Sequence, residues 1–279
     1  MIALPIKCDK EPEGREAIVS ESIFTEKLEE WRKNQEQPWN LLRYRLTERN
    51  LLDAVGEHGP LQILDVGGGD GRDALPLARR GHTVTLVDYV PEMLAEAKRR
   101  AAETGVAARI QTRLVDLATG TLPVAAGTFD VVLCHNVIQY LAAPQPVLAA
   151  CAAALRPAGW LSLLVPNPAS EALRLALQQH DLPGALASLD SSTHRNFLFD
   201  AEVHLHDLPA LFAMLEGAGL GVADYCGVRC VNDYMRDDAR KFSADGFEQL
   251  TALELAMGRR SPYRDIARLW QILARPRTA

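Results

Sequence analysis

Short apolar runs alternate with amphipathic segments along the middle of the chain. Two of these runs, LQILDV at 61–66 and TVTLVD at 83–88, are rich in β-branched residues, as is typical of strands covered on both faces. Between them, DALPLARR predicts a short helix that ends at Gly81. The order strand, glycine-rich turn, helix, strand predicts a right-handed βαβ unit of a parallel sheet.

The same alternation continues to residue 165. Two further strands are expected in ARIQTRLVD and TFDVVLCHNV, then a helix from Val147 to Leu155 and a strand in GWLSLLVP. Beyond it we expect a helix at 207–218, a strand near 220–231, a helix around 239–258 and a final strand near 265–274. Strands that alternate with helices predict a doubly wound, Rossmann-like α/β sheet.

Two regions outside this alternation are expected to cover the sheet. Residues 15–56 have helical periodicity with a break at Pro38–Trp39, so we predict an N-terminal helical cover over 1–58. The stretch of roughly 40 residues after Pro166 is too long for a simple connection, which predicts a helical lid over 166–206. The nucleotide-binding core then spans 59–165, and 207–279 completes the sheet.

Composition restricts the class of protein. With 279 residues, 48% of them hydrophobic and 24% charged, the chain is expected to form one large soluble domain. It lacks a signal-like start and any apolar run of about 18 residues, and its five cysteines have no CxxC spacing, so we predict a cytoplasmic protein with reduced thiols and no membrane partner. The net charge of −6 gives no overall attraction to phosphate backbones but leaves a local basic face possible.

Two pairs of residues have weak metal-ligand character. Cys226 and Cys230 lie four residues apart within a predicted strand and turn. His204 and His206 are two residues apart, which would place both imidazoles on one face of a strand. Both pairs are better explained as ordinary buried or solvated positions, so we expect no metal site.

The glycine-rich turn after the first strand carries the chemistry. Gly67, Gly69 and Gly71 let the backbone turn sharply and approach a ligand closely. The pattern is GxGxG, and Arg72 stands where the dinucleotide fingerprint has its third glycine, which disfavours an NAD-dependent oxidoreductase. Asp88 at the end of the next strand can accept hydrogen bonds from both hydroxyls of a ribose.

LDVGGGDG followed by VTLVD resembles the first two motifs of the class I S-adenosylmethionine-dependent methyltransferases. FDVVLCHNVIQYL resembles the fourth-strand motif of that family, whose closing residues lie beside the methyl group, and LRPAGWLSL resembles its helix-to-strand turn, with Ala158 in place of a glycine. The resemblance implies a mostly parallel seven-stranded sheet with a C-terminal antiparallel hairpin, and S-adenosylmethionine as cofactor. The cofactor-binding residues that it implies, with Arg43 added from the second resemblance below, are Arg43, Asp65, Gly67, Gly68, Gly69, Gly71, Asp88, Tyr89, Asp116, Leu117 and His135.

The outer parts of the chain resemble a narrower group. PWNLLRYRL, GVRCVNDYMRDD and FEQLTALELAMGRRSPYRDIARLWQILARP are similar to the bacterial tRNA 5-carboxymethoxyuridine methyltransferases, which esterify a carboxylate on the wobble uridine. This similarity implies that Arg43 contacts the cofactor, that His135 lies against it, and that Arg229, Asp233 and Tyr234 approach the acceptor. Arg45 is a second candidate for the cofactor's carboxylate, although either arginine could equally lie on the surface.

One departure weakens the RNA hypothesis. The lysine-rich run of the tRNA-modifying members is replaced here by ALASLDSSTHRNFLFDAE, and losing phosphate contacts lowers nucleic-acid affinity steeply. Four arginines near the C-terminus could build another basic face, but they also suit an ordinary solvated helix: Arg259, Arg260, Arg264 and Arg268.

We therefore predict a methyltransferase that acts on an oxygen, most simply a carboxylate, of a small molecule. A carboxylate is ionised at neutral pH and needs no base, and Arg229 would anchor it. A hydroxyl or amine acceptor would need a base, for which His135 is the candidate, although His135 also suits a wall of the cofactor pocket. The predicted catalytic residues are His135, Arg229 and Tyr234, and aromatic rings that could stack on an acceptor are Tyr140, Trp39 and Tyr234.

Two alternatives remain at this stage. One is the carboxyl methylation of tRNA 5-carboxymethoxyuridine, which requires a continuous basic rim around the cleft. The other is a non-catalytic S-adenosylmethionine-binding module, in which the methyl-facing side of the cleft would be blocked. The sequence leaves the oligomeric state open.

Overall fold

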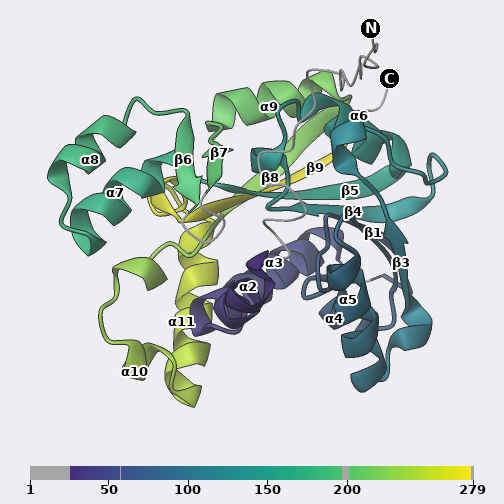
Figure 1. The fold of residues 1–279 in the computed structure, drawn as a ribbon, viewed down its shortest axis with the longest axis horizontal. Helices are drawn as coiled ribbons and strands as arrows, with labels where there is room; N and C mark the ends of the chain where they lie inside the picture. Colours follow the sequence, from purple (N-terminus) through teal and green to yellow (C-terminus); the bar gives the residue numbers. More distant parts are fainter. Residues whose placement is uncertain (1–25, 57, 197–200, 278–279) are drawn as a thin grey trace, which may run out of the picture.

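The computed structural model describes residues 26–56, 58–196 and 201–277 of the chain. A seven-stranded sheet of order β3-β2-β1-β4-β5-β9-β8 runs through the molecule (Figure 1). Its strands are β1 (Gln62–Val66), β2 (Thr83–Asp88), β3 (Ile110–Leu114), β4 (Phe129–His135), β5 (Leu155–Pro166), β8 (Leu220–Val228) and β9 (Leu269–Pro276). Because β9 runs antiparallel to both β5 and β8 while β1 to β5 are parallel, the predicted Rossmann-like sheet with a C-terminal antiparallel hairpin is confirmed.

Helices cover both faces of the sheet, as its apolar strands require. One face packs against α3 (Pro38–Val55), α4 (Ala74–Arg79) and α5 (Pro91–Glu103), and the other against α6 (Gln145–Ala154) and α9 (Leu208–Gly217) (Figure 1). The central strands β1 and β4 are therefore buried almost throughout, which explains why their sequences are continuous apolar runs. Proline in the first turn sets the start of α3 and of α5, where no backbone N–H is needed.

The N-terminal cover consists of α2 (Leu28–Gln35) and α3, which are separated at Pro38 as predicted. The part of the prediction that falls on residues 15–25 lies outside the described residues. Among the described helices, none combines the length and the apolar content that a membrane span requires.

The segment 166–206, predicted as a helical lid, contains a strand hairpin as well as helices. It contains α7 (Pro168–Gln178) and α8 (Leu182–Ser188), followed by an antiparallel hairpin of β6 (Thr193–Asn196) and β7 (Ala201–His204). Each strand is four residues long: THRN of β6 is wholly polar and shows no alternation, and AEVH of β7 alternates over too few residues to identify a strand in a sequence.

The elements after β8 also differ in detail from the prediction. The strand ends at Val228 because Arg229 adopts a left-handed backbone conformation with φ of 65°. The helix expected around 239–258 is divided into α10 (Asp238–Lys241) and α11 (Ala244–Gly258), because Ser243 caps α11 through the backbone N–H of Gly246. Short 3-10 helices lie in the connections between these elements: η1 (Ala107–Arg109), η2 (Leu117–Thr119), η3 (Ile138–Tyr140), η4 (Asn232–Tyr234) and η5 (Arg264–Ile266).

Candidate functional site

A cavity of about 490 Å³ lies at the carboxyl ends of the central strands. The strand order reverses between β1 and β4, and open α/β sheets bind their ligands at such a switch point. The volume lies in the range of small-molecule sites. The predicted site residues that line it are Arg43, Asp65, Gly67, Gly68, Gly69, Asp88, Tyr89, Asp116, Leu117, His135 and Arg229.

The turn after β1 forms one wall of the cavity and has to be bare backbone. Gly67 has φ of 67°, and a Cβ there would lie 2.5 Å from Cγ2 of Val137 at the end of β4. A Cβ on Gly68 would lie 2.5 Å from the Asp65 carboxylate. Gly71 is outside the cavity lining; its φ of 81° is the left-handed conformation that favours glycine in the turn.

The floor of the cavity holds a buried carboxyl group that lacks a full set of hydrogen-bond partners. Asp65 is 1% exposed, and its Oδ2 has no hydrogen-bond partner in the described part of the chain. Burial, together with the nearby Asp73 and Asp88 carboxylates, raises the pKa of Asp65 well above its usual range. A buried carboxylate without a partner is costly, so this position fits a ligand that brings a cationic group.

Two backbone hydrogen bonds fix the orientation of the Asp88 carboxylate at the end of β2. Its Oδ2 accepts a hydrogen bond from the backbone N–H of Gly69 and its Oδ1 one from Val90, each at 2.9 Å. Burial nevertheless raises the pKa of Asp88. On β3's side of the site, Asp116 accepts a bond from the backbone N–H of Ala118 at 2.8 Å and begins η2, next to the buried Leu117. The family resemblance assigns both carboxylates to the nucleoside, and both line the cavity.

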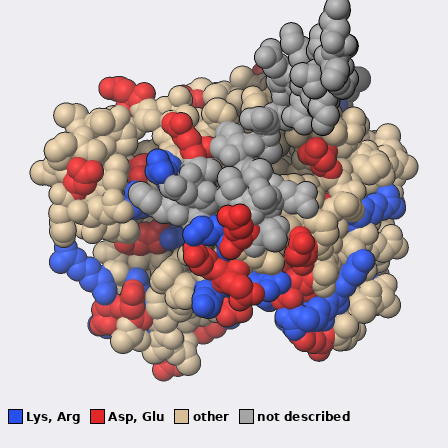
Figure 2. All heavy atoms as spheres, in the orientation of Figure 1, with Lys and Arg blue, Asp and Glu red and all other residues tan. Residues whose placement is uncertain are grey.

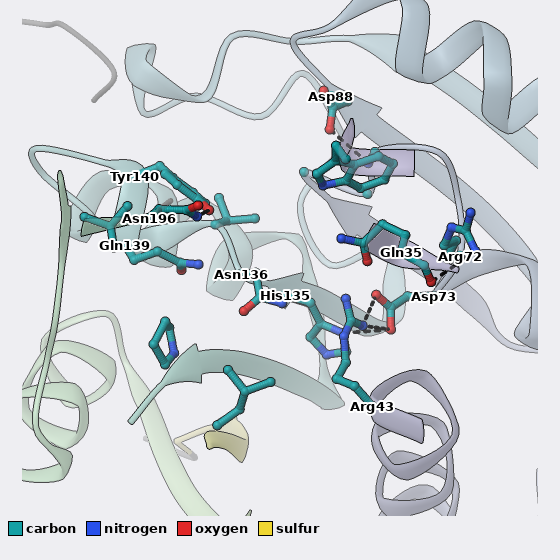
Figure 3. Close-up of a pocket in the computed structure, with 18 of the residues that line it drawn as sticks. Gln35, Arg43, Arg72, Asp73, Asp88, His135, Asn136, Gln139, Tyr140 and Asn196 are labelled. Carbon is teal, nitrogen blue, oxygen red and sulfur yellow. Dashed lines mark hydrogen bonds and ion pairs between the residues drawn. The ribbon is translucent and has the colours of Figure 1, made fainter. Parts of the chain in front are cut away.

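Asp73 is a site residue that the sequence analysis missed. It lies between Arg43 and His135 (Figure 3), with its oxygens 2.6 and 2.8 Å from Nη1 of Arg43 and Oδ1 3.2 Å from Nδ1 of His135. Burial alone would raise the pKa of Asp73, but these two neighbours outweigh it and hold it well below its usual range. An acidic residue at the start of the helix after a glycine turn is the signal that could have revealed it.

Arg43 therefore lines the cavity but is already paired within the protein. Its guanidinium also stacks on the ring of Tyr44, 3.8 Å from the centroid. Arg45 instead faces Glu248 and the ring of Phe247, away from the cavity lining. Of the two candidate arginines, the structure brings only Arg43 to the site.

Helix α2 covers the nucleotide end of the cavity. Trp31 packs with Met93 and Tyr89 beside the glycine turn, and Gln35 accepts a hydrogen bond from the hydroxyl of Tyr44 at 2.7 Å. Arg72 reaches α2 through the Glu36 carboxylate at 3.5 Å and contacts Asp70 at 3.0 Å. Trp31 and Gln35 were not predicted, because nothing local in the sequence shows what α2 packs against.

The opposite end of the cavity, beyond the end of β4, is rich in basic side chains. The lining there includes Arg174, His194, Arg229 and Arg268. Glu171 of α7 lies within 3.3 Å of Arg268, 3.1 Å of His194 and 2.5 Å of Arg174. Arg229 is paired with Asp233 at 2.5 Å. Three guanidinium groups thus share two carboxylates, which leaves this end positive and suited to an anionic ligand.

Other predicted residues lie elsewhere. Tyr234 is outside the cavity lining, and its hydroxyl donates to the carbonyl of Ile266 at 3.2 Å. Trp39 is not in the lining either, whereas Tyr140 is, and it accepts a hydrogen bond from Asn196 at 2.9 Å (Figure 3).

The C-terminal arginines do not form one basic face. Arg268 lines the cavity, whereas Arg264 stacks on the ring of Tyr225 and Arg259 pairs with Asp53. Arg260 donates to the carbonyl of Ala256. Among the described residues, no group of three or more His, Cys, Asp or Glu side chains has a metal-binding arrangement.

Comparisons with known proteins agree with this geometry. A family model described as a methyltransferase domain matches residues 64–163. The tRNA 5-carboxymethoxyuridine methyltransferase of Escherichia coli (strain K12) is 31% identical over 237 residues, covering 84% of this chain and 88% of that protein. The ubiquinone biosynthesis O-methyltransferase of Xanthomonas axonopodis pv. citri (strain 306) is 32% identical over 168 residues, covering 60% and 65%. The structure of the Burkholderia thailandensis 1,6-didemethyltoxoflavin-N1-methyltransferase, solved with S-adenosylhomocysteine, matches with a TM-score of 0.59 at 18% identity, covering 92% and 87%.

Proposed function

The chain belongs to the class I S-adenosylmethionine-dependent methyltransferases, and from that premise we propose that it methylates a carboxylate oxygen of a small-molecule acid. The observation that carries the proposal is the positive end of the cavity, where Arg174, Arg229 and Arg268 line the wall. A non-catalytic binding module would have a blocked methyl-facing side. The cavity continues past the end of β4, which supports a catalytic site instead.

The residues present fit the cofactor. When bound, S-adenosylmethionine supplies an already activated methyl group on its sulfonium. Asp65, which is buried and lacks a partner for Oδ2, would hold the ammonium of the amino acid part, and Asp88 the ribose. Tyr89, Asp116 and Leu117 would line the adenine.

In this proposal the chain's own residues align the acceptor and exclude water. Arg229 and Arg268 would orient the carboxylate, and their attraction is strengthened because both guanidinium side chains are mostly buried. Alignment alone can supply an effective molarity of about 10⁵ M or more. A carboxylate is ionised at neutral pH, so no side chain has to remove a proton from it.

A second acceptor is favoured by one specific observation. The E. coli tRNA 5-carboxymethoxyuridine methyltransferase is similar over 88% of its own length, including the regions outside the sheet. The surface gives this candidate less support, because Lys and Arg side chains alternate with Asp and Glu among the described residues of the face in Figure 2. We therefore rank the tRNA carboxylate second.

Labelled S-adenosylmethionine tests the proposal. The protein is incubated with a metabolite extract and, separately, with tRNA from a strain that lacks the gene. We expect base-labile methyl label, as in a methyl ester, in the metabolite fraction. Label confined to the tRNA fraction would contradict the small-molecule acceptor and support the second candidate, and base-stable label would contradict carboxylate methylation.

Arg268→Gln checks the role of the positive end. Burial and the nearby Arg229 lower the pKa of Arg268, so removing its charge relieves repulsion and the fold should persist. We expect kcat/KM for the acceptor to fall by about 10- to 150-fold, the effect of one charged hydrogen bond. The matched control is Arg260→Gln, which removes an exposed arginine outside the cavity lining and should leave kcat/KM unchanged.

A further inference from the structure

Polar side chains connect the cofactor cavity with the interior of the sheet. His135 at the end of β4 contacts Ser162 of β5, which contacts Gln271 of β9, which in turn contacts Asn50 of α3. Ser162 and Gln271 are each 0% exposed. Buried polar groups of this kind are costly unless all their hydrogen bonds are made, so the direction of each bond in the chain is strongly constrained.

The amide of Gln271 can adopt only one orientation. Its Nε2 lies 3.0 Å from the backbone carbonyl of Thr47, and a carbonyl can only accept a hydrogen bond. Its Oε1 accepts from Nδ2 of Asn50 at 3.0 Å. A flipped amide would place two acceptors against each other at Thr47. The second N–H of Nε2 therefore points at Oγ of Ser162, 2.9 Å away.

This orientation decides where the hydroxyl proton of Ser162 lies. Because Nε2 of Gln271 is a donor only, Oγ of Ser162 must accept from it. The single proton of the hydroxyl is then available for its other neighbour, Nε2 of His135 at 2.8 Å. If that ring nitrogen carried a proton, the buried hydroxyl proton of Ser162 would have no acceptor among the described residues, so the arrangement that satisfies every donor places the imidazole proton on the other nitrogen.

The opposite side of the ring agrees with this assignment. Nδ1 of His135 faces Oδ1 of Asp73 at 3.2 Å, and Arg43 keeps this carboxylate ionised, so it can only accept. Nδ1 makes this contact at ion-pair distance without hydrogen-bond alignment. The serine on one side and the carboxylate on the other thus favour the same tautomer.

We propose that Ser162 and Gln271 are positioning residues that hold His135 as its Nδ1–H tautomer, so that this N–H faces the ionised Asp73 at the wall of the cofactor cavity and the imidazole does not act as a base. The lone pair of the imidazole, at Nε2, accepts the hydrogen bond from Ser162 inside the sheet. It is therefore out of reach of a methyl acceptor in the cavity. The mechanistic consequence rests on the proposed function: an enzyme without a base at this position is suited to an acceptor that arrives ionised, as a carboxylate does.

Nuclear magnetic resonance of the full chain labelled with ¹⁵N-histidine tests the tautomer. The signals of His135 are assigned by their loss in His135→Gln. We expect Nδ1 to carry the proton and Nε2 to be unprotonated and hydrogen-bonded. A wild-type protein with the proton on Nε2 would overturn the proposal. No acceptor is needed for this measurement, so it stands apart from any failure of carboxylate methylation.

Variants test the positioning role. Ser162→Ala removes the hydroxyl donor, so the ¹⁵N signals of His135 should shift toward a mixture of tautomers, and affinity for S-adenosylhomocysteine should fall by about 2- to 10-fold, as expected for one hydrogen bond. Ser162→Thr keeps the hydroxyl and should restore both. Gln271→Met removes the bond that orients Ser162 and should change the signals in the same direction.

Thr251→Ala is the matched control, since it removes another buried hydroxyl, one that bonds the carbonyl of Phe247 within α11. It should change neither the His135 signals nor the affinity. Unchanged His135 signals in Ser162→Ala, or an equal affinity loss in Thr251→Ala, would show that Ser162 has a structural role only.

Discussion

At the scale of single residues, the site is built around a carboxylate that the folded protein leaves unsatisfied. Asp65 is buried beside Asp73 and Asp88, but Arg43 is engaged with Asp73 and the backbone N–H groups with Asp88. Oδ2 of Asp65 has no such partner among the described residues. The cost of burying this charge is the free energy that a cationic ligand can recover on binding.

Replacing Asp65 should raise the stability of the free protein and lower its affinity for the cofactor. Asp65→Asn keeps the shape of the side chain and removes its charge. The free energy of unfolding of the ligand-free protein should therefore rise by about 0.5–2 kcal/mol at neutral pH, as it does for other substitutions that relieve functional strain. Affinity for S-adenosylhomocysteine should drop by about 10- to 150-fold, because a charge-assisted hydrogen bond is lost. Urea denaturation and calorimetry measure the two quantities. A variant less stable than wild type would contradict this account.

Cofactor binding should depend on pH through the same residue. The pKa of Asp65 is raised in the free protein, so below that pKa the carboxyl is neutral, whereas a bound ammonium favours the ionised form. Binding then releases a proton, and affinity rises by up to about tenfold per pH unit until the raised pKa is passed. Calorimetry with S-adenosylhomocysteine in buffers of different ionisation enthalpy counts the protons. Asp65→Asn should lose this dependence, and proton uptake by the wild type would refute the assignment.

At the scale of elements, α11 holds the turn that carries Arg229. Glu254 of α11 is 1% exposed and accepts hydrogen bonds from the backbone N–H groups of Cys230, Val231 and Asn232 at 2.5, 3.1 and 2.7 Å. Burial raises the pKa of Glu254 although these donors favour its ionised form. The left-handed backbone of Arg229 is thus maintained by a carboxylate from a helix that does not line the cavity.

Glu254→Ala should destabilise the protein by about 2–4 kcal/mol, because three buried N–H groups lose their acceptor. It should also raise the acceptor KM, since the turn that presents Arg229 is released. Urea denaturation and steady-state kinetics are the measurements. Glu248→Ala on the same helix breaks only an exposed ion pair with Arg45 and should stay within about 0.5 kcal/mol of wild type. Equal effects of the two substitutions would exclude a special role for Glu254.

At the scale of the whole molecule, the cavity lies between parts of the chain that are far apart in sequence. The central strands supply the carboxylates, the N-terminal α2 and α3 cover the nucleotide end, and α7, β6 and the end of β8 close the acceptor end (Figure 1). A ligand that spans the cavity therefore contacts every part of the fold and should stabilise all of it together.

S-adenosylhomocysteine at about 100 times its Kd should raise the Tm by about 5–10 °C, the effect of about 2.7 kcal/mol on a domain of this size. NAD at the same concentration should give no shift, because Arg72 replaces the third glycine of the dinucleotide fingerprint. Thermal denaturation monitored by fluorescence gives both values. A shift with NAD, or none with S-adenosylhomocysteine, would contradict the cofactor assignment.

The sequence allowed the sheet and the nucleotide end of the site to be predicted, because their signals are local. The apolar runs and the glycine turn mark β1 and β2 within a few residues, and Asp65 and Asp88 are placed by their distance from that turn. The β6–β7 hairpin was missed because β6 is wholly polar and the alternation of β7 covers only four residues. Arg268 was considered only as part of a surface, and Tyr234 was placed at a cavity that it does not line.

What the sequence determined by itself is the class of fold, since periodicity and turn chemistry act between neighbouring residues, and, through its resemblance to the methyltransferases, the cofactor. What only the tertiary structure decided is how the polar groups are paired: Arg43 with Asp73, Glu171 with three basic side chains, and Asn50 with Gln271, 221 positions later. Such pairs form when distant segments are packed together and buried polar atoms must find partners. No local pattern of residues records which partner each will find.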